Sequence, residues 1–158
     1  MRDATLCLLM KDRKLLLGNK KRGFGINKLN GFGGKINPGE NIKEAAVREL
    51  YEEVGLQANS QNINRVGELT FIFPSKEEWN QVVHVFLIEN WKNSPKESEE
   101  MTFEWTDADK IPFERMWADD EYWLPLVLDG KKIKANFIFN EDNETIKNKE
   151  IFEINELE

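Results

Sequence analysis

The sequence predicts an α/β (α+β) protein in which two helices flank a mixed sheet. Three observations support this class. Several short segments are rich in β-branched and aromatic residues, as strands are. Residues 41–55 have a helical period and helix-capping residues at both ends, and a second helix is expected over 118–130. At 158 residues the chain fits a single domain, 1–158.

The expected strands are separated by turns and by one long glycine-rich loop. They cover residues 5–12, 14–21, 66–74, 82–91, 100–107 and 132–140. A turn at 11–13 joins the first two, and the tail, 144–158, is expected to form a hairpin with 133–139. Residues 23–40 contain six glycines and one proline, which predicts irregular, tightly folded backbone.

Both expected helices carry local signals at their ends. In the first, Asn41 can cap the N-terminus, Glu44 occupies the capping-box position, and Gly55 suits the C-terminal stop. In the second, Pro125 is expected either to kink the helix or to lie in its first turn. Helices with such signals should begin and end close to these residues.

The charge and the cysteine content of the sequence restrict which partners and which compartment are expected. With 29 acidic and 22 basic residues the net charge is −7, and the longest basic run is "NKKRG" at 19–23, so no nucleic-acid partner is expected. An acidic protein can bind a polyphosphate only if metal cations screen the repulsion. The single cysteine, Cys7, excludes an intrachain disulfide and favours a reducing, cytoplasmic compartment. We expect no signal peptide, no membrane partner and a monomer.

Three glutamates of the first helix share one face. At about 100° per residue, Glu49, Glu52 and Glu53 fall within an arc of roughly 100°, beside an apolar stripe that would face the core. On spacing alone, a solvated acidic face explains this arrangement. Clustered carboxylates are also the oxygen ligands that Mg²⁺ and Mn²⁺ prefer, and the glycine-rich loop before the helix would allow a ligand to come close.

Loop and helix together form a longer pattern. Gly34 is followed after five residues by Glu40 and after seven more by "RELYEEVGL" at 48–56. This spacing fits G-x5-E-x7-R-E-U-x-E-E-x-G-U, where U is a bulky aliphatic residue, at every restricted position. This pattern is the Nudix box, here residues 34–56, and the chain therefore resembles the Nudix hydrolases. The resemblance implies a Nudix fold, an α/β/α sandwich around a mixed sheet that contains this loop and helix.

The resemblance also implies a reaction. Nudix hydrolases cleave nucleoside diphosphates linked to another group, and they use divalent metals held by the box helix. Matching positions imply that Glu49, Glu52 and Glu53 bind Mg²⁺ (Mn²⁺ as a substitute) together with the Gly33 carbonyl. Arg48 would orient a glutamate, and Glu40 would hold the loop against the helix. A metal lowers the pKa of bound water, and the water attacks a phosphorus so that pyrophosphate leaves. Glu53 or a carboxylate outside the box would accept the proton.

The resemblance extends to the MutT-homologue, oxidised purine nucleoside triphosphatase (8-oxo-dGTP diphosphatase) proteins. The segments that carry it are "KKRGFG" at 20–25, "NGFGGK" at 30–35, "VHVF" at 83–86, "ESEEM" at 97–101, "KIPF" at 110–113 and "MWADDEYWLPL" at 116–126. They imply hydrolysis of 8-oxo-dGTP and 2-hydroxy-dATP and thus sanitation of the nucleotide pool. Residues 73–86, which contain Gln81 and Val82, differ from the family, as does the tail 141–158.

In this family the aromatic and acidic segment reads the base. The implied substrate-binding residues are Thr5, Lys20, Phe24, Asn30, Phe32, Gly33, Gly34, Lys35, Phe71, Trp117, Asp119 and Asp120, and Glu100 matches an acidic residue near the metals. Trp117 would stack on the purine while Asp119 and Asp120 bind its edge. Two close carboxylates share a proton, so the pair could donate or accept. We therefore hypothesise tolerance of both 8-oxo-guanine and 2-hydroxy-adenine.

Other interpretations remain open from the sequence. Asp119 and Asp120 could serve only as favourable charges at a helix N-terminus, with Trp123 in the core. His84 lies in an apolar strand and fits a structural role better than a catalytic one. A Nudix enzyme of another specificity would keep the helix but act on unmodified triphosphates, nucleotide sugars, dinucleoside polyphosphates or ADP-ribose. A nucleotide-binding module with an idle box is the remaining class, although this box has lost no glutamate.

Overall fold

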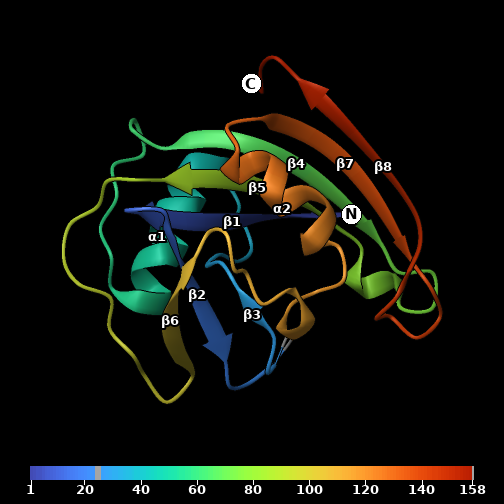
Figure 1. Cartoon of the computed structure of the whole chain (residues 1–158), viewed down its shortest axis with the longest axis horizontal. Coiled ribbons are helices and arrows are strands. Elements are labelled where there is room, and N and C mark those ends of the chain that lie inside the picture. Colours follow the sequence, from blue (N-terminus) through green and yellow to red (C-terminus); the bar gives the residue numbers. More distant parts are fainter. Residues whose placement is uncertain (24–25, 158) are drawn as a thin grey trace.

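A computed structural model describes residues 1–23 and 26–157. Within that part of the chain, eight strands form one mixed sheet, and two α-helices cover its opposite faces (Figure 1). Alternate residues of β1 (Arg2–Lys11) face opposite ways. Leu6 and Leu8 pack with α2 (Asp120–Leu128), whereas Cys7 and Leu9 pack with α1 (Ile42–Val54). The expected class, a mixed sheet between two helices, is confirmed.

The strands follow the order β3-β2-β1-β5-β4-β7-β8, with β6 on the other edge of β2. β1 pairs in parallel with β5 and β4 in parallel with β7, while the remaining pairs are antiparallel. The bounds are β2 (Lys14–Lys20), β3 (Leu29–Asn30), β4 (Asn64–Ile72), β5 (Gln81–Ile88), β6 (Met101–Asp107), β7 (Lys132–Phe139) and β8 (Ile146–Ile154). Two 3₁₀ turns, η1 (Glu77–Trp79) and η2 (Phe113–Arg115), lie between them.

The two expected hairpins both form. Asp12 and Arg13 have φ of 53° and 60°, the left-handed pair of a two-residue turn, so Lys11 pairs directly with Lys14. At the other end of the chain, β8 pairs antiparallel with the whole of β7, as expected for the tail. The last hairpin thus extends the sheet beyond β4.

The first helix is capped as its sequence predicts. The Asn41 side chain accepts a hydrogen bond from the Glu44 N–H (2.9 Å), and the Glu44 carboxylate accepts one from the Asn41 N–H (3.2 Å). Gly55 has φ of 74° and donates to the Tyr51 carbonyl (2.8 Å). Because a left-handed residue ends the helix there, the last glutamate of the box lies just before the stop.

The second helix is shorter than the expected 118–130. It covers Asp120–Leu128, and Pro125 is its sixth residue, on the exposed side. Pro125 therefore lies beyond the first turn. Its missing N–H would have bonded Glu121, which is itself exposed, so water can satisfy that carbonyl. Trp123 and Val127 are buried on the opposite side, where they hold α2 on the sheet.

The sheet opens where β1 leaves β2. β1 pairs with β2 only at Leu9–Lys11, and β3 takes the same edge of β2 further along, at Gly18. The glycine-rich loop fills the space between β1 and β3 and bonds to β1 through Phe32 and Lys35. This opening places the loop, the helix that follows it and the free half of β1 around one site.

We predict that core packing of α1, and not its exposed surface, determines stability. Leu50 is fully buried whereas Tyr51, its neighbour on the same helix, is 54% exposed. Leu50→Ala should therefore lower the free energy of unfolding by about 2–5 kcal/mol, because it leaves a cavity. Tyr51→Ala, the matched control, should change it by less than about 0.5 kcal/mol. Urea denaturation, monitored by circular dichroism, measures the free energy of unfolding of both variants. Equal losses of stability in the two would contradict the prediction.

Candidate functional site

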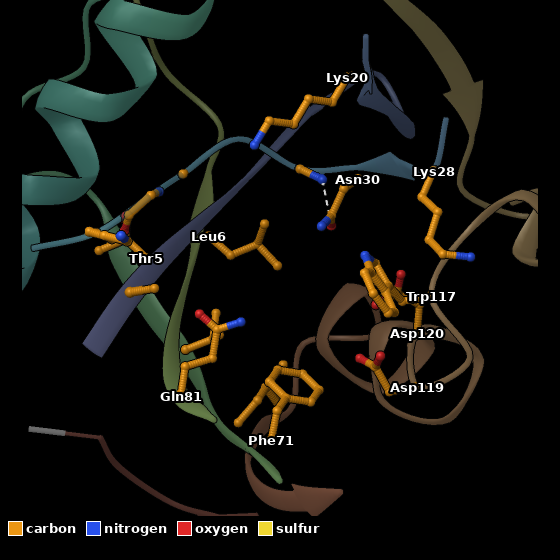
Figure 2. A pocket seen from close by; sticks show the side chains of 18 of the residues that line it. Thr5, Leu6, Lys20, Lys28, Asn30, Phe71, Gln81, Trp117, Asp119 and Asp120 are labelled. Carbon is orange, nitrogen blue, oxygen red and sulfur yellow. Dashed lines mark hydrogen bonds between the residues drawn. The ribbon is translucent and has the colours of Figure 1, made fainter. Parts of the chain in front are cut away.

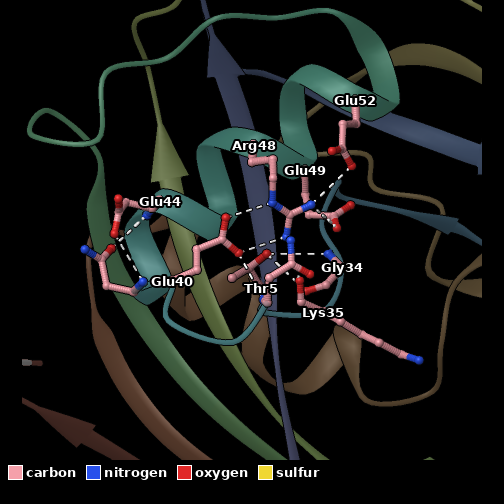
Figure 3. Close-up of polar contacts among 10 residues, drawn as sticks. Thr5, Gly34, Lys35, Glu40, Glu44, Arg48, Glu49 and Glu52 are labelled. Carbon is pink, nitrogen blue, oxygen red and sulfur yellow. Dashed lines mark hydrogen bonds and ion pairs between the residues drawn. The ribbon is translucent and has the colours of Figure 1, made fainter.

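Arg48 joins the box loop to the box helix (Figure 3). Its Nε and Nη2 donate to the two oxygens of Glu40 at 2.8 and 2.9 Å, the bidentate geometry of strong arginine–carboxylate pairs. Its Nη1 donates to Glu49 (2.9 Å) and Glu52 (3.2 Å). These hydrogen bonds with Arg48 are the main reason that the pKa of Glu40 lies below its usual value. One guanidinium thus fixes three carboxylates.

The glycines allow the loop to lie directly against β1 and α1. The Thr5 N–H donates to the Gly34 carbonyl (2.8 Å), and Arg48 Nη2 donates to the Lys35 carbonyl (3.0 Å). A Cβ on Gly33 would lie 1.8 Å from the Thr5 carbonyl oxygen, and one on Gly34 would lie 2.6 Å from the Glu49 carboxylate. Neither position can hold a side chain without moving the backbone or the glutamate.

Glu53 is a partly buried carboxylate of the box. It accepts a hydrogen bond from the Gly33 N–H (3.2 Å). The pKa of Glu53 is raised to about 7, chiefly by burial and in smaller part by the charges of Glu49 and Glu52, whereas the Gly33 hydrogen bond and Lys20 oppose the shift. This carboxylate therefore experiences both loss of water and repulsion from its neighbours, which a nearby cation would relieve.

The box carboxylates suit a divalent cation by their chemistry. Hard cations bind carboxylate and carbonyl oxygens, and the helix face and the Gly33 backbone supply both kinds. Within residues 1–23 and 26–157, no three carboxylate, histidine or cysteine side chains already stand close enough to form a ligand set. Glu49 and Glu52 instead point one oxygen each at Arg48. The donor set fits the metal, and its side chains would have to turn to bind it.

A cavity of about 350 Å³ connects the box to the aromatic and acidic segment (Figure 2). Most of the expected substrate-binding residues line it, namely Thr5, Lys20, Asn30, Gly33, Gly34, Lys35, Phe71, Trp117, Asp119 and Asp120. Glu53 lines it at the box end. The structure thus brings together residues that are more than 100 positions apart in the sequence.

Several lining residues were not identified from the sequence as parts of the site. They include Leu6, Lys28, Phe73, Met101, Trp123 and Phe139, whereas Gln81, which also lines the cavity, lies in the segment that was expected to differ from the family. Phe73 could have been found, because it directly follows β4 and is two residues from Phe71, so it continues the same side of that strand. Phe139 stacks on Phe73 at 4.6 Å, but only the pairing of β7 with β4 reveals this.

Two expected residues do not line the cavity, and a third cannot be placed. Phe32 is fully buried in the α1 core and is absent from the cavity wall, so the structure does not bring it to the expected substrate site. Its pairing with Cys7 turns the ring toward α1 and over Gly18. Glu100 is exposed, lies 3.8 Å from Arg22, and does not line the cavity. Phe24 lies outside the described residues.

Asp119 and Asp120 are buried in the cavity wall, each only 3% exposed. The Trp123 indole N–H donates to Asp119 Oδ2 (2.8 Å), whereas Oδ2 of Asp120 has no hydrogen-bond partner among the described residues. Burial raises the pKa of Asp119 to about 6, and burial together with the charge of Asp119 raises that of Asp120 well above its usual range. Burial and the closeness of the two carboxyl groups thus favour a state in which the pair shares a proton.

Asp119 and Asp120 stand at the start of α2 and Trp123 is buried, as the alternative of favourable charges at a helix N-terminus also expects. Asp119 occupies the N-cap position of α2, but its side chain makes no capping hydrogen bond. It binds Trp123 instead. His84 lies elsewhere, buried between Asp3 (3.0 Å) and Arg65 (2.6 Å) and absent from the cavity wall, which agrees with a structural role.

The chain is similar to known Nudix proteins over most of its length. A sequence model of the NUDIX domain matches residues 1–127. Proteins named oxidized purine nucleoside triphosphate hydrolase share 44% identity with it, over 92% of this chain and 91% of the protein from Danio rerio, and over 90% and 88% for Mus musculus. An 8-oxo-dGTP diphosphatase from Escherichia coli is 37% identical over 54% of this chain and 67% of that protein.

The fold of this chain is also found in a solved structure. A MutT protein from Bacillus halodurans superposes with a TM-score of 0.82 at 23% identity, over 96% of this chain and 97% of that one. Among the described residues, no helix is long and apolar enough to cross a membrane. The box, its helix and the sheet that carries them therefore occur together here as they do in that fold, and the chain belongs to the Nudix hydrolase family.

Proposed function

We propose that this enzyme hydrolyses oxidised purine nucleoside triphosphates, 8-oxo-dGTP and 2-hydroxy-dATP, to the monophosphate and pyrophosphate. The cavity carries the proposal, because it joins the box glutamate Glu53 to a buried aspartate pair beside Trp117. The animal relatives that are 44% identical are named for this activity. In a cell the reaction would remove damaged nucleotides before they reach DNA.

Base recognition would take place at the α2 end of the cavity. Trp117 lines this end of the cavity (Figure 2), where its indole could stack on a purine, and Asn30 and the aspartates could offer hydrogen bonds to the edge of the base. Oxidation at C8 changes N7 of guanine from an acceptor to a donor. A carboxylate of Asp119 or Asp120 can accept that hydrogen bond, while the proton retained by the pair can be donated to an oxygen of the base.

The phosphates would lie at the other end, near Lys20, Thr5 and the glycine loop. Nudix hydrolases generally use a divalent metal, and we propose Mg²⁺, with Mn²⁺ as a substitute, held by the oxygens of Glu49, Glu52, Glu53 and Gly33, with Glu100 nearby. The bound metal would supply charge neutralisation and a more acidic water. Glu53, already shielded from solvent, would accept a proton from the water as its oxygen bonds to phosphorus and the bond to pyrophosphate breaks.

We also propose that residues 1–158 act as one domain, as a monomer, in the cytoplasm. The continuous sheet from β3 to β8 supports the first point, since the tail adds its last strand. The only cysteine, Cys7, is buried, and burial raises the pKa of its thiol, so it is unsuited to form a disulfide. Sedimentation velocity would test whether the protein is a monomer in solution.

The first experiment compares pyrophosphate release from 8-oxo-dGTP, 2-hydroxy-dATP, dGTP and ADP-ribose with Mg²⁺. We expect kcat/KM for the oxidised purines to exceed that for dGTP by tenfold or more, about 1.4 kcal/mol of discrimination. Glu53→Gln should lower kcat at least about 100-fold, because it removes a proton acceptor. Glu44→Gln is the matched control on the same helix, since glutamine preserves the capping box. Preference for ADP-ribose or dGTP would refute the proposed substrate.

The second experiment tests the shared proton. The preference for 8-oxo-dGTP over dGTP should fall as the pH is lowered through about 6, because the Asp119 carboxylate, whose pKa is about 6, then gains a proton and becomes a weaker acceptor. Taking the ratio of the two kcat/KM values cancels titrations that affect only the chemical step. Asp119→Asn should make this ratio smaller and independent of pH. An unchanged pH profile in that variant would rule the mechanism out.

A further inference from the structure

We propose that Lys28 and Glu144 form a positioning pair that holds the Trp117 ring as the stacking wall of the cavity. The inference rests on the proposed function and adds a residue pair that determines how tightly the base is bound. Lys28 lies in the loop before β3, and Glu144 lies in the turn between β7 and β8. Their contact joins two segments that are 116 residues apart.

The lysine covers one face of the indole. The Lys28 ammonium nitrogen lies 5.1 Å from the centroid of the Trp117 ring, within the range of a cation–π interaction. Figure 2 shows the indole nearly edge-on, with Lys28 on one side and the side chains of Leu6 and Gln81 on the other. One face of the ring therefore meets a cation while the opposite face is directed into the cavity.

The aromatic neighbours limit the ring further. Phe73 and Phe139 lie with their centroids 6.4 and 6.2 Å from that of Trp117, at interplanar angles of 71° and 85°. These contacts restrict where the ring can move along the sheet. A cation centred over one face favours the orientation in which that face stays toward it.

Glu144 holds the ammonium group in place. Its carboxylate accepts a hydrogen bond from Lys28 at 3.0 Å, and the Lys28 side chain is only 24% exposed. The turn that carries Glu144 is itself well fixed. Asp142 Oδ1 accepts from the backbone N–H of Glu144 and of Thr145, both at 2.9 Å. The anchor is therefore part of a structured turn and not the end of a mobile segment.

A second contact joins the same turn to the segment after β4, which carries Phe73. The Ser75 hydroxyl donates to Asn143 Oδ1 (3.0 Å) and is also 2.9 Å from the Glu141 carbonyl. The β7–β8 turn thus bonds to the chain just after β4 on one side and to Lys28 on the other. These hydrogen bonds hold the turn, and with it Glu144, next to Lys28.

The pair should affect binding of the base and not the chemical step. Lys28 lies beside Trp117 in the cavity wall (Figure 2), whereas Glu53 lines the cavity from the box helix. A ring that tilts freely loses stacking contact with a purine, which weakens binding. The carboxylates around Arg48 keep all their contacts, so kcat should stay unchanged while KM rises.

The test measures binding of 8-oxo-dGMP by quenching of tryptophan fluorescence, together with kcat and KM for 8-oxo-dGTP. Lys28→Met keeps most of the stem but removes the charge, and it should weaken 8-oxo-dGMP binding about threefold to tenfold with kcat unchanged. Lys28→Arg should bind like the wild type, because it retains both the cation and the ion pair. Glu144→Gln should have a smaller effect than Lys28→Met.

A charge exchange separates the cation–π contact from the ion pair. The double variant Lys28→Glu/Glu144→Lys restores an ion pair but places a carboxylate near the ring, so it should not recover binding. Lys131→Met is the matched control, since Lys131 forms a similar surface ion pair with Glu153 at 3.1 Å. Circular dichroism verifies that each variant is folded. Full recovery in the double variant, or binding by Lys28→Met within twofold of wild type, would overturn the proposal.

The same measurement distinguishes this inference from the proposed function. Binding of 8-oxo-dGMP and binding of dGMP to the wild-type protein are both measured. If it binds both equally and Lys28→Met weakens both, the positioning role holds and the oxidised substrate is refuted. If wild type prefers 8-oxo-dGMP and Lys28→Met has no effect, only the positioning role fails. Binding of neither nucleotide would refute both.

Discussion

The hydrogen bonds of one guanidinium group determine how the rest of the site is arranged. Arg48 contacts the loop through Glu40 and the Lys35 carbonyl, and it contacts its own helix through Glu49 and Glu52. A planar fork with fixed donor directions can satisfy these acceptors only in one relative placement of loop and helix. The loop must then pass so close to β1 that Gly33 has no room for a side chain.

The two ends of the cavity meet opposite electrostatic demands. At the box end, clustered carboxylates repel one another and burial raises the pKa of Glu53, so cationic groups stabilise their charged form. At the other end, burial keeps a proton on the Asp119–Asp120 pair. In the proposed reaction, the box end, once neutralised by cations, would take the polyphosphate of the substrate despite the net charge of −7, and the other end would bind the uncharged base. The two tasks would thus be separated along one cavity.

Local features of the fold could be predicted from the sequence, because caps, turns and the box act over a few residues. The capping box at Asn41 and the left-handed stop at Gly55 are examples. The contributions of Lys28 and Phe139 to the cavity could not be predicted, since they depend on which strands pair. The burial of Phe32 against α1 could not be predicted either, because a glycine-flanked residue in an irregular loop has no periodicity that tells which face it takes.

Discrimination in the proposed reaction depends on hydrogen bonding more than on size. Oxidation adds a single oxygen atom to guanine, and a pocket that only measured shape would distinguish the two bases weakly. A buried acceptor left without a partner costs more than a lost contact, about 1–3 kcal/mol. Asp119 is a buried carboxylate, and it is the acceptor that the pH experiment tests. Guanine, whose N7 also accepts, would give it no hydrogen bond, whereas the N7–H of 8-oxo-guanine could bond to it. In the proposed reaction, the buried aspartate pair would therefore make the undamaged base the poorer ligand.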